Sequence, residues 1–466
     1  MNSKLPVNVD IQDIWQKDKD HVIHPWTDFT TFKEEGSLIM SKGENVYVYD
    51  VYGNKYLDGI GGLWCVNVGY GRQEIADAVS AQIMELPYFS PFGHQTTAPA
   101  AKLAAKLAEH APESLNHVFF GCGGSVANDT AVRLIHHYFH QIGQPSKKKL
   151  IARKDAYHGS TYISMSLTGI EADHIGFEIH NQLVHHVSCP NPYRKPESQS
   201  MEDFCNEKVQ ELEDTILALG PDNVAAFFAE PIMGAGGVIV PPEGYHVKTL
   251  AVCKKYNVLY VSDEVVTAFG RLGHMFASEA VFGIVPDIIT CAKGLSSGYL
   301  PLGATIISDE IYDAISKPHH EGGLLTHGFT YSGHPVSCVA ALKNIEIIER
   351  ENICEHVQDV GVYFEEQLKT LADLEIVGQV RGKKFMMCIE NLRNKETKEL
   401  FDGSIGVGKR IANHCQKLGL IVRPVGHMNV LSPPLILTRE QIDFTVKTLR
   451  HAIQNTIQEL KAEGHL

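Results

Sequence analysis

Short apolar runs alternate with amphipathic stretches through the middle of the chain, between residues 69 and 331. In the amphipathic stretches, apolar residues recur every three or four positions, which is typical of helices. Alternation of apolar strands with such helices predicts an α/β fold, a large doubly wound domain with a mostly parallel sheet. The predicted strands are 117–120, 150–152, 224–229, 258–262, 288–292 and 303–308, and the clearest helices are 99–109, 126–140 and 245–256.

The pattern differs at both ends of the chain. Two segments with alternating polarity, 46–50 and 55–58, flank a glycine-containing turn and predict a β-hairpin. After residue 335, a long helix over 336–349 leads into a mixed region that ends in a helix near 440–459.

We therefore expect two domains. The segment 69–335 forms the large one. The N-terminal segment 1–68 contributes to a smaller α+β domain, which the C-terminal segment 336–466 completes.

The composition is that of an ordinary globular protein and narrows the possible partners. Of 466 residues, 44% are hydrophobic and 21% are charged, and the formal net charge is −14. This acidic balance disfavours nucleic acid and anionic membranes. The ten cysteines include no Cys-x-x-Cys pair, and no histidine spacing is typical of a metal site. Since the N-terminal residues also lack the apolar core of a signal peptide, we expect reduced cysteines, no metal and a cytoplasmic location.

Two ionisable residues stand at the carboxyl ends of predicted strands. Lys293 follows the run 288–292, and Asp263 follows the run 258–262. Open α/β sheets bind ligands at this edge. A lysine that is desolvated there has a lowered amine pKa and can form a Schiff base. A pyridoxal 5′-phosphate (PLP) site needs two such residues. A lysine binds the aldehyde of the cofactor, and an acid keeps its pyridine nitrogen protonated.

A glycine-rich segment over 121–125 lies between the strand 117–120 and the helix that follows it. Gly124 lets the backbone approach an anion, and Ser125 can cap the helix and donate its hydroxyl, so the segment can bind a phosphate. The alternative is an ordinary glycine-rich turn with a serine cap, because this arrangement is common.

Two further segments end strands with polar or aromatic residues. Tyr157 and His158 follow the strand 150–152, where a tyrosine either stacks on a flat ring or lies at the edge of the core. Glu230 closes the run 224–229 and is followed by a proline, so it is either a site residue or a simple strand terminator. One charged strand terminator is usually structural, whereas several beside a glycine-rich loop favour a shared site.

Over essentially its full length the chain resembles the class III PLP-dependent aminotransferases, which have fold type I. It is most similar to their ω-amino acid:pyruvate and amine:pyruvate branch. The motifs that carry the resemblance are Gly61-Gly62-Leu63-Trp64-Cys65-Val66-Asn67-Val68-Gly69, Tyr157-His158-Gly159, Glu230-Pro231-Ile232, Asp263-Glu264-Val265, Phe269-Gly270-Arg271, Ala292-Lys293-Gly294 and Gly328-Phe329-Thr330-Tyr331-Ser332-Gly333-His334-Pro335.

The resemblance implies a role for each residue around the cofactor ring. Lys293 is the residue that binds the aldehyde of PLP, and Asp263 pairs with the protonated pyridine nitrogen. Val265 and Tyr157 are expected to enclose the ring from its two faces. Lys293 and Asp263 are therefore the expected catalytic residues.

The resemblance also implies how the rest of the cofactor is held. Gly124 and Ser125 are expected to bind its phosphate, and His158 and Glu230 belong to the cofactor-binding set. Thr330 is expected to reach the phosphate of a neighbouring subunit, so the resemblance implies a homodimer with shared sites; the sequence leaves open whether dimers pair into a tetramer.

Substrate recognition is expected from a few residues. Arg423 matches the mobile arginine of the family, whose guanidinium binds a substrate carboxylate; the alternative is a surface ion pair. Glutamate-using relatives often have a glutamate to mask that arginine where this chain has Ala235, which favours pyruvate as the acceptor. Trp64, Phe89 and Phe92 can wall a pocket for the amine donor or can belong to the core.

Three positions depart from the family pattern. Val126 replaces a glutamate just after the phosphate segment, and Ala268 and Lys384 stand where glycine is usual. Because Lys293 and Asp263 are retained, these departures affect specificity rather than the class of reaction.

The expected activity is transfer of an amino group from an ω-amino acid, a taurine-like donor or a (di)amine to pyruvate. The products are alanine and an aldehyde or oxo acid. The alternatives are 2-oxoglutarate as acceptor, a related PLP-dependent mutase or decarboxylase, a Schiff-base lyase without PLP, and a non-catalytic binding protein.

Overall fold

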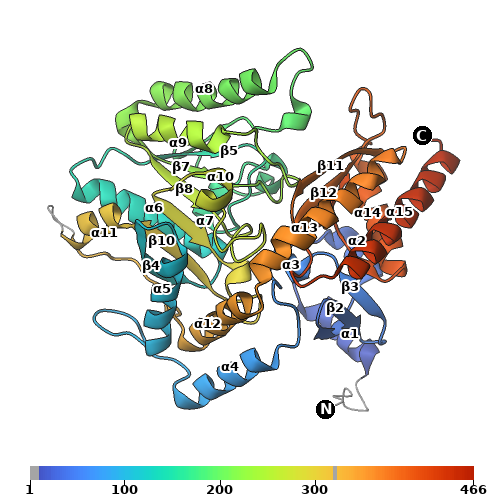
Figure 1. Ribbon diagram of the computed structural model, residues 1–466, viewed down its shortest axis with the longest axis horizontal. Helices are drawn as coiled ribbons and strands as arrows, with labels where there is room; N and C mark the ends of the chain where they lie inside the picture. The colour runs from blue at the N-terminus through green and yellow to red at the C-terminus, as the bar shows by residue number, and fades with distance from the viewer. Residues whose placement is uncertain (1–9, 318–322) are drawn as a thin grey trace.

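A seven-stranded sheet lies at the centre of the larger part of the molecule (Figure 1). The computed structural model describes residues 10–317 and 323–466. Strands β9, β8, β7, β5 and β6 are parallel, whereas β10 is antiparallel to both of its neighbours. The predicted α/β class with a mostly parallel sheet is therefore confirmed. In sheet order the strands are β4 (Leu115–Gly121), β10 (Gly303–Ser308), β9 (Ile288–Cys291), β8 (Leu259–Asp263), β7 (Val224–Ala229), β5 (Lys149–Arg153) and β6 (Val184–Val187).

Helices cover both faces of this sheet. In β7 every residue is buried; Ala226 and Phe228 pack against α6 on one face, and Phe227 and Ala229 pack against α8 and α9 on the other. A strand that is buried on both faces is apolar at every position, which is why the runs are recognisable in the sequence. The helices of this part are α4 (Gln73–Glu85), α5 (Ala98–His110), α6 (Gly124–Gln141), α7 (Tyr162–Leu167), α8 (Met201–Leu219), α9 (Tyr245–Lys255), α10 (Ser278–Phe282), α11 (Asp309–Ser316) and α12 (Pro335–Arg350).

The predicted strand bounds hold for β7 and β10 and shift slightly elsewhere. Strand β8 begins and ends one residue later than expected, so that Asp263 is its last residue. Strand β9 ends at Cys291, and the extension of this strand to residue 292 was wrong because the chain already turns there.

The two ends of the chain meet in a second part of the molecule. The short strand β13 pairs in parallel with β3, so the N-terminal hairpin β2–β3 and the C-terminal region share a sheet. In Figure 1 the blue strands lie beside the orange and red helices. The domain boundaries given above stay a prediction. The elements are α1 (Ile11–His21), α2 (Phe29–Glu35), β1 (Met40–Glu44), β2 (Tyr47–Asp50), β3 (Lys55–Asp58), α3 (Gly61–Trp64), α13 (Ile353–Lys369), β11 (Val377–Lys383), β12 (Met386–Asn391), α14 (Val407–Lys417), β13 (Leu420–Ile421), β14 (Arg423–Val425), β15 (Met428–Leu431) and α15 (Arg439–Ala462).

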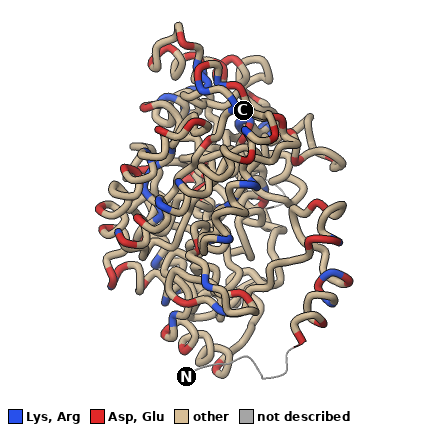
Figure 2. The backbone as a smooth tube through the Cα atoms, turned by 90° about the vertical axis from the view of Figure 1, so that its right-hand side faces the viewer, with Lys and Arg blue, Asp and Glu red and all other residues tan. Residues whose placement is uncertain are grey.

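Charged residues of both signs are interspersed along the backbone (Figure 2). Among the described residues, no helix combines the length and the apolar character that crossing a membrane requires.

Candidate active site

Lys293 lies directly beyond the carboxyl end of β9, in the short 3₁₀ turn Lys293–Leu295. Its φ of 45° places it in the left-handed region, which is uncommon for a residue with a side chain and is often found at functional sites. Desolvation lowers the pKa of the amine, and the charge of Arg423 lowers it further, whereas Asp263 and Glu230 act in the opposite direction. The net result is an amine that is more readily neutral, as a nucleophile requires.

Asp263 is buried at the end of β8, and three donors fix its carboxylate. Its Oδ2 accepts hydrogen bonds from Asn128 Nδ2 at 2.8 Å and from His158 Nδ1 at 2.7 Å, and its Oδ1 accepts one from Val265 N at 3.1 Å. These bonds compensate for the burial of the charge and hold it in one orientation.

Asn128 is a site residue that the sequence reasoning missed. Its Nδ2 also donates to the carbonyl of His158 at 2.7 Å, and its Oδ1 accepts a hydrogen bond from Thr290 at 2.8 Å. The side chain therefore joins α6, β8, β9 and the segment after β5. Its one sequence signal is the helical spacing to buried Ala131 and Ile135, which places an amide on the core face of α6.

The glycine-rich segment leads into α6, as predicted, but Ser125 does not cap this helix. The cap residue is Gly123, without a side-chain hydrogen bond, and Ser125 is the second helical residue. Its Oγ accepts a hydrogen bond from Ser160 N at 3.1 Å. A Cβ on Gly124 would lie 2.9 Å from Val265 Cγ1, so only glycine fits against Val265 here. The backbone N–H groups at the start of α6 remain suited to a phosphate.

Glu230 connects two turns rather than standing free. It is buried, and its two carboxylate oxygens accept hydrogen bonds from Tyr157 N at 3.0 Å and Gly234 N at 2.8 Å. Burial raises the pKa of this carboxyl group, and the nearby charge of Asp263 adds to the effect. Tyr157 is partly exposed, and its hydroxyl forms a hydrogen bond with Ser160 Oγ at 2.9 Å.

Arg423, at the start of β14, is partly buried, and its charge acts on Lys293. Desolvation lowers the pKa of its guanidinium group, with a smaller opposite effect from Tyr157. Within the described ranges, its side chain forms no ion pair and no hydrogen bond, so the alternative of a surface ion pair is wrong. A desolvated guanidinium group without a counter-ion is suited to bind a carboxylate.

The aromatic residues divide into two groups. Trp64 is buried at 4% exposure and packs with Ile232, Met386 and Val430. Phe89 and Phe92 are exposed, and Phe92 lies close enough to Gly328 that a Cβ there would be 3.0 Å from its ring.

Thr330 is exposed in the segment that follows Gly328, and its carbonyl accepts a hydrogen bond from Tyr88 at 2.7 Å. Considering only residues 10–317 and 323–466, no hydrogen bond, ion pair or ring contact joins Thr330 or Phe92 to Lys293. The structure thus brings together Lys293, Asp263, Glu230 and Arg423, whose charges act on one another, whereas Thr330 and Phe92 are exposed.

Of the three departures, one has a clear structural consequence. Lys384 adopts a φ of 54°, which explains why glycine is usual at this position, and its N–H donates to Glu365 Oε1 at 2.7 Å. Val126 packs against Gly121, where a Cβ would be 2.5 Å from its Cγ1. Ala268 is buried, and nothing around it explains the absence of glycine.

The described residues fit PLP. A lysine with a depressed amine pKa, an oriented buried carboxylate and a glycine-walled helix start are present in one chain. Among these residues, no group of three or more His, Cys, Asp or Glu side chains is placed to hold a metal ion.

Comparisons with known proteins agree with this geometry. The family model of class III aminotransferases matches residues 31–453. The putrescine–pyruvate aminotransferase of Pseudomonas aeruginosa is 42% identical over 457 residues, which cover 98% of this chain and 99% of that protein. The mitochondrial gamma aminobutyrate transaminase 1 of Solanum lycopersicum is 42% identical over 431 residues, 91% of this chain and 84% of that protein. The crystal structure of an (S)-enantioselective omega-transaminase from Thermomicrobium roseum superimposes with a TM-score of 0.93 at 38% identity, covering 96% of this chain and 99% of that chain.

Proposed function

The chain belongs to the class III aminotransferase family, and on that premise we propose that it transfers an amino group from an ω-amino acid or (di)amine to pyruvate with PLP as its cofactor. The named activity of the Pseudomonas relative supports both a diamine donor and pyruvate as acceptor. Membership in an enzyme family disfavours the alternative of a non-catalytic binding protein.

Each of the strand-end residues has a task toward the cofactor in this proposal. When bound, PLP supplies an aldehyde that condenses with amines and a pyridinium ring that withdraws electrons. Lys293 binds the aldehyde, and Asp263 holds the ring nitrogen protonated. Gly124 and Ser125 bind the phosphate, and Val265 and Tyr157 enclose the ring.

His158 and Glu230 act on their neighbours. His158 donates to the same carboxylate oxygen of Asp263 as Asn128 does. Glu230 fixes the backbone of Tyr157 and of the turn at Gly234. Both are therefore positioning residues, since they orient groups that touch the cofactor.

Lys293 also moves the proton in this proposal. With PLP bound, the neutral amine of Lys293 would take a proton from the substrate carbon as the base, and the resulting ammonium would then return it as the acid. The lowered pKa of the amine favours the basic form at neutral pH. Asp263 would keep the ring nitrogen of bound PLP protonated, and the ring would then supply the electron withdrawal that this proton transfer requires.

The observation that carries the choice of acceptor is the unpaired guanidinium group of Arg423, together with Ala235. The carboxylate of pyruvate compensates the desolvated charge of Arg423 by a bidentate pair. Because Ala235 has no acid to neutralise the arginine, position 235 supplies no carboxylate that competes with pyruvate. This favours pyruvate over 2-oxoglutarate.

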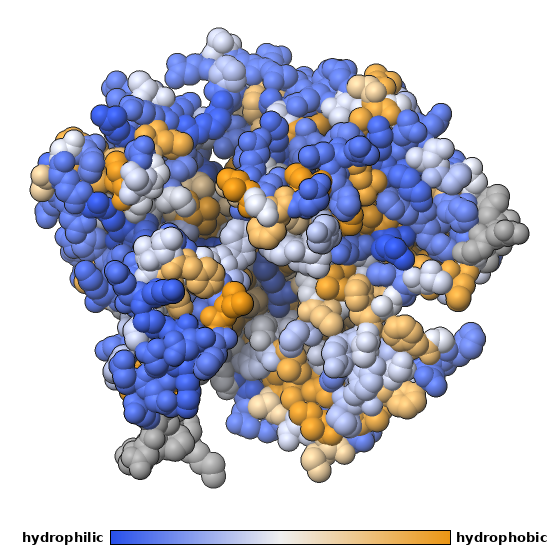
Figure 3. Space-filling view, turned by 180° about the vertical axis from the view of Figure 1, so that it is seen from behind, coloured by the Kyte–Doolittle hydropathy of each residue, from blue (hydrophilic) through white to orange (hydrophobic). Residues whose placement is uncertain are grey.

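A homodimer with shared sites completes the proposal. Large apolar side chains are exposed next to Thr330, among them Tyr331 at 58% and Phe92 at 54%, and Met84 and Leu324 are exposed at 84% and 77%. Figure 3 shows apolar patches on the back of the molecule. Exposed apolar patches mark interfaces between proteins, and in the proposed dimer Thr330 would reach the partner's cofactor.

We place the protein in the cytoplasm. Its ten cysteines are all free, and several of them are buried, as is usual in a reducing compartment.

Amine-dependent formation of alanine tests the proposal. The purified protein, supplied with PLP and pyruvate, is assayed with putrescine, β-alanine, γ-aminobutyrate and taurine in separate reactions. Alanine formation with at least one donor is expected, with much less glutamate when 2-oxoglutarate replaces pyruvate. Glutamate formation at an equal or higher rate would contradict the proposed acceptor.

A further inference from the structure

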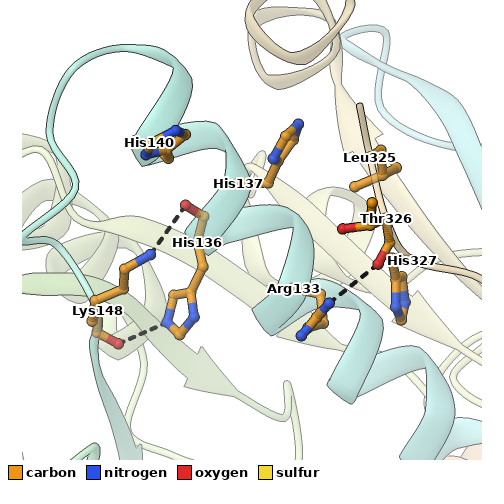
Figure 4. A pocket seen from close by; sticks show the side chains of 8 residues that line it. All are labelled: Arg133, His136, His137, His140, Lys148, Leu325, Thr326 and His327. Atoms are coloured by element: carbon orange, nitrogen blue, oxygen red, sulfur yellow. Dashed lines mark hydrogen bonds between the residues drawn. The ribbon is translucent and has the colours of Figure 1, made fainter. Parts of the chain in front are cut away.

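A cavity of about 310 Å³ lies against the helix α6, away from the residues proposed for catalysis. Figure 4 shows α6 with Lys148 on one side and the segment 325–327 on the other. None of its lining residues belongs to the site described above. Its basic side chains are Arg133, His136, His137, His140, Lys148 and His327.

The charge of this cavity is opposite to that of the chain. The protein carries 55 acidic and 41 basic residues, yet no carboxylate is among the residues that line the cavity. Within the part of the chain that the structure describes, Arg133 and Lys148 form no ion pair. The charge of Asp129 acts on the lining residue His327, and its carboxylate accepts hydrogen bonds from Ser164. Two cations without a counter-ion indicate a place for an anion.

Hydrogen bonds hold the two cations in place. The Lys148 ammonium donates to the carbonyl of His136 at 3.4 Å, and the His136 ring donates in return to the carbonyl of Lys148 at 2.9 Å. Arg133 Nη2 donates to the carbonyl of Thr326 at 3.2 Å, which leaves further N–H groups of the guanidinium fork for a ligand.

The histidines are suited to neutral hydrogen bonding. His137 Nε2 is buried and has no hydrogen-bond partner in the described structure. Desolvation lowers the pKa of His137, and it lowers that of His136 to about 4, so both rings are neutral near pH 7. A neutral ring donates one N–H without adding charge, and an acceptor in the cavity would satisfy His137.

We propose that this cavity binds the phosphate group of a small anion, either free phosphate or a phosphate monoester. The planar fork of Arg133 and the point charge of Lys148 complement the several oxygens of a phosphate. The ring of His137, whose Nε2 has no partner in the described structure, can add a neutral donor. A carboxylate would use only part of this donor set.

Occupancy of the cavity stabilises the contact between α6 and the segment that leads to Thr330. Besides the bond from Arg133 to Thr326, His327 forms a hydrogen bond with Thr130 of α6 at 3.0 Å and stacks on Phe119 at a centroid distance of 5.1 Å. A ligand that bridges Arg133 and this segment adds to these contacts and raises the melting temperature.

Calorimetric titration of the PLP-loaded enzyme with inorganic phosphate tests the proposal. Loading with PLP keeps phosphate out of the cofactor's own phosphate site. We expect saturable binding, with affinity reduced by at least about tenfold in Arg133→Gln and in Lys148→Gln, since each removes a charge-assisted contact. Arg393→Gln, an exposed arginine paired with Glu399, is the matched control and keeps the wild-type affinity.

Phosphorus NMR of the added phosphate detects binding independently of heat, and a melting curve shows that each variant is folded. A titration with glycerol 2-phosphate distinguishes the two kinds of ligand. Tighter binding than that of inorganic phosphate indicates that the cavity binds a phosphate monoester, and weaker binding indicates that it binds free phosphate. Absence of binding in both measurements, or equal affinity in the wild type and both cavity variants, would overturn the proposal.

Discussion

The strand-end cluster and the exposed segment around Thr330 contribute to the proposed site in different ways. In the cluster, Asp263 is buried and fixed by three donors from three segments. Thr330 is exposed, and its carbonyl accepts a hydrogen bond from the Tyr88 hydroxyl. In the proposed dimer, one chain organises the chemistry in advance, whereas a second chain completes the binding surface. Changes in the cluster should affect catalysis strongly, and changes in the exposed segment should act weakly and across subunits.

Replacement of the lysine should have the largest effect. Lys293→Ala removes the proposed proton-transferring amine, and we expect turnover to fall by more than about a hundredfold. The rate of alanine formation from amine and pyruvate measures this turnover. The mass of the assembled protein, measured by light scattering, is the control for folding. A variant with near wild-type turnover would falsify the assignment of Lys293.

Removal of the Asn128 amide, which holds Asp263, should have the second-largest effect on activity. Asn128→Ala leaves one of the carboxylate's donors missing, and we expect activity to fall about ten- to a hundredfold, corresponding to roughly 1–3 kcal/mol. Affinity for PLP should fall as well, as measured by fluorescence titration. Asn116→Ala, which changes an exposed asparagine that bonds to Asp309, is the control. Similar losses in both variants would assign the effect to general destabilisation.

The acceptor site gives an intermediate, selective effect. In Arg423→Ala we expect the KM for pyruvate to rise about tenfold or more through loss of a charge-assisted pair, with a smaller change in the KM for a carboxylate-free amine such as putrescine. Equal rises for both substrates would remove Arg423 from the acceptor role.

The smallest effect is expected on the exposed surface. Thr330→Ala should weaken PLP binding only about two- to tenfold, because one hydroxyl contact is lost. A mixed dimer combines one chain that carries Thr330→Ala with one chain that carries Lys293→Ala. If Thr330 acts on the partner's site, the site with the intact Lys293 receives an intact Thr330 from the other chain. That site should then bind PLP with wild-type affinity. Weakening confined to the chain that carries the substitution would contradict a shared site.

The sequence predicted most of the large sheet because its strands are buried on both faces. Strands β7 and β10 were located to the residue. Strand β6 was missed, since His185 and His186 interrupt its apolar pattern. Its polarity is tolerated because β6 is the edge strand of the sheet and these two residues are only partly buried.

Within the site, residues at strand ends were predictable and those that support them were not. Asp263 and Lys293 follow apolar runs, so position alone indicated them. Asn128 acts through bonds to segments far away in the sequence, and such contacts have no local pattern. The contact of Arg271 likewise has no local pattern. This residue is fully buried and donates a hydrogen bond to Asn67 Oδ1 at 2.7 Å, and no spacing in the sequence reveals that bond.

The visible spectrum of the PLP-loaded enzyme through one cycle of substrates tests the central claim most directly. The account predicts a yellow absorbance band that is absent in Lys293→Ala, is bleached by an amine donor without acceptor, and returns when pyruvate is added after the amine is removed. Bleaching that is restored by 2-oxoglutarate but not by pyruvate would contradict the proposed acceptor. A protein that binds no PLP and shows no band would contradict the account as a whole.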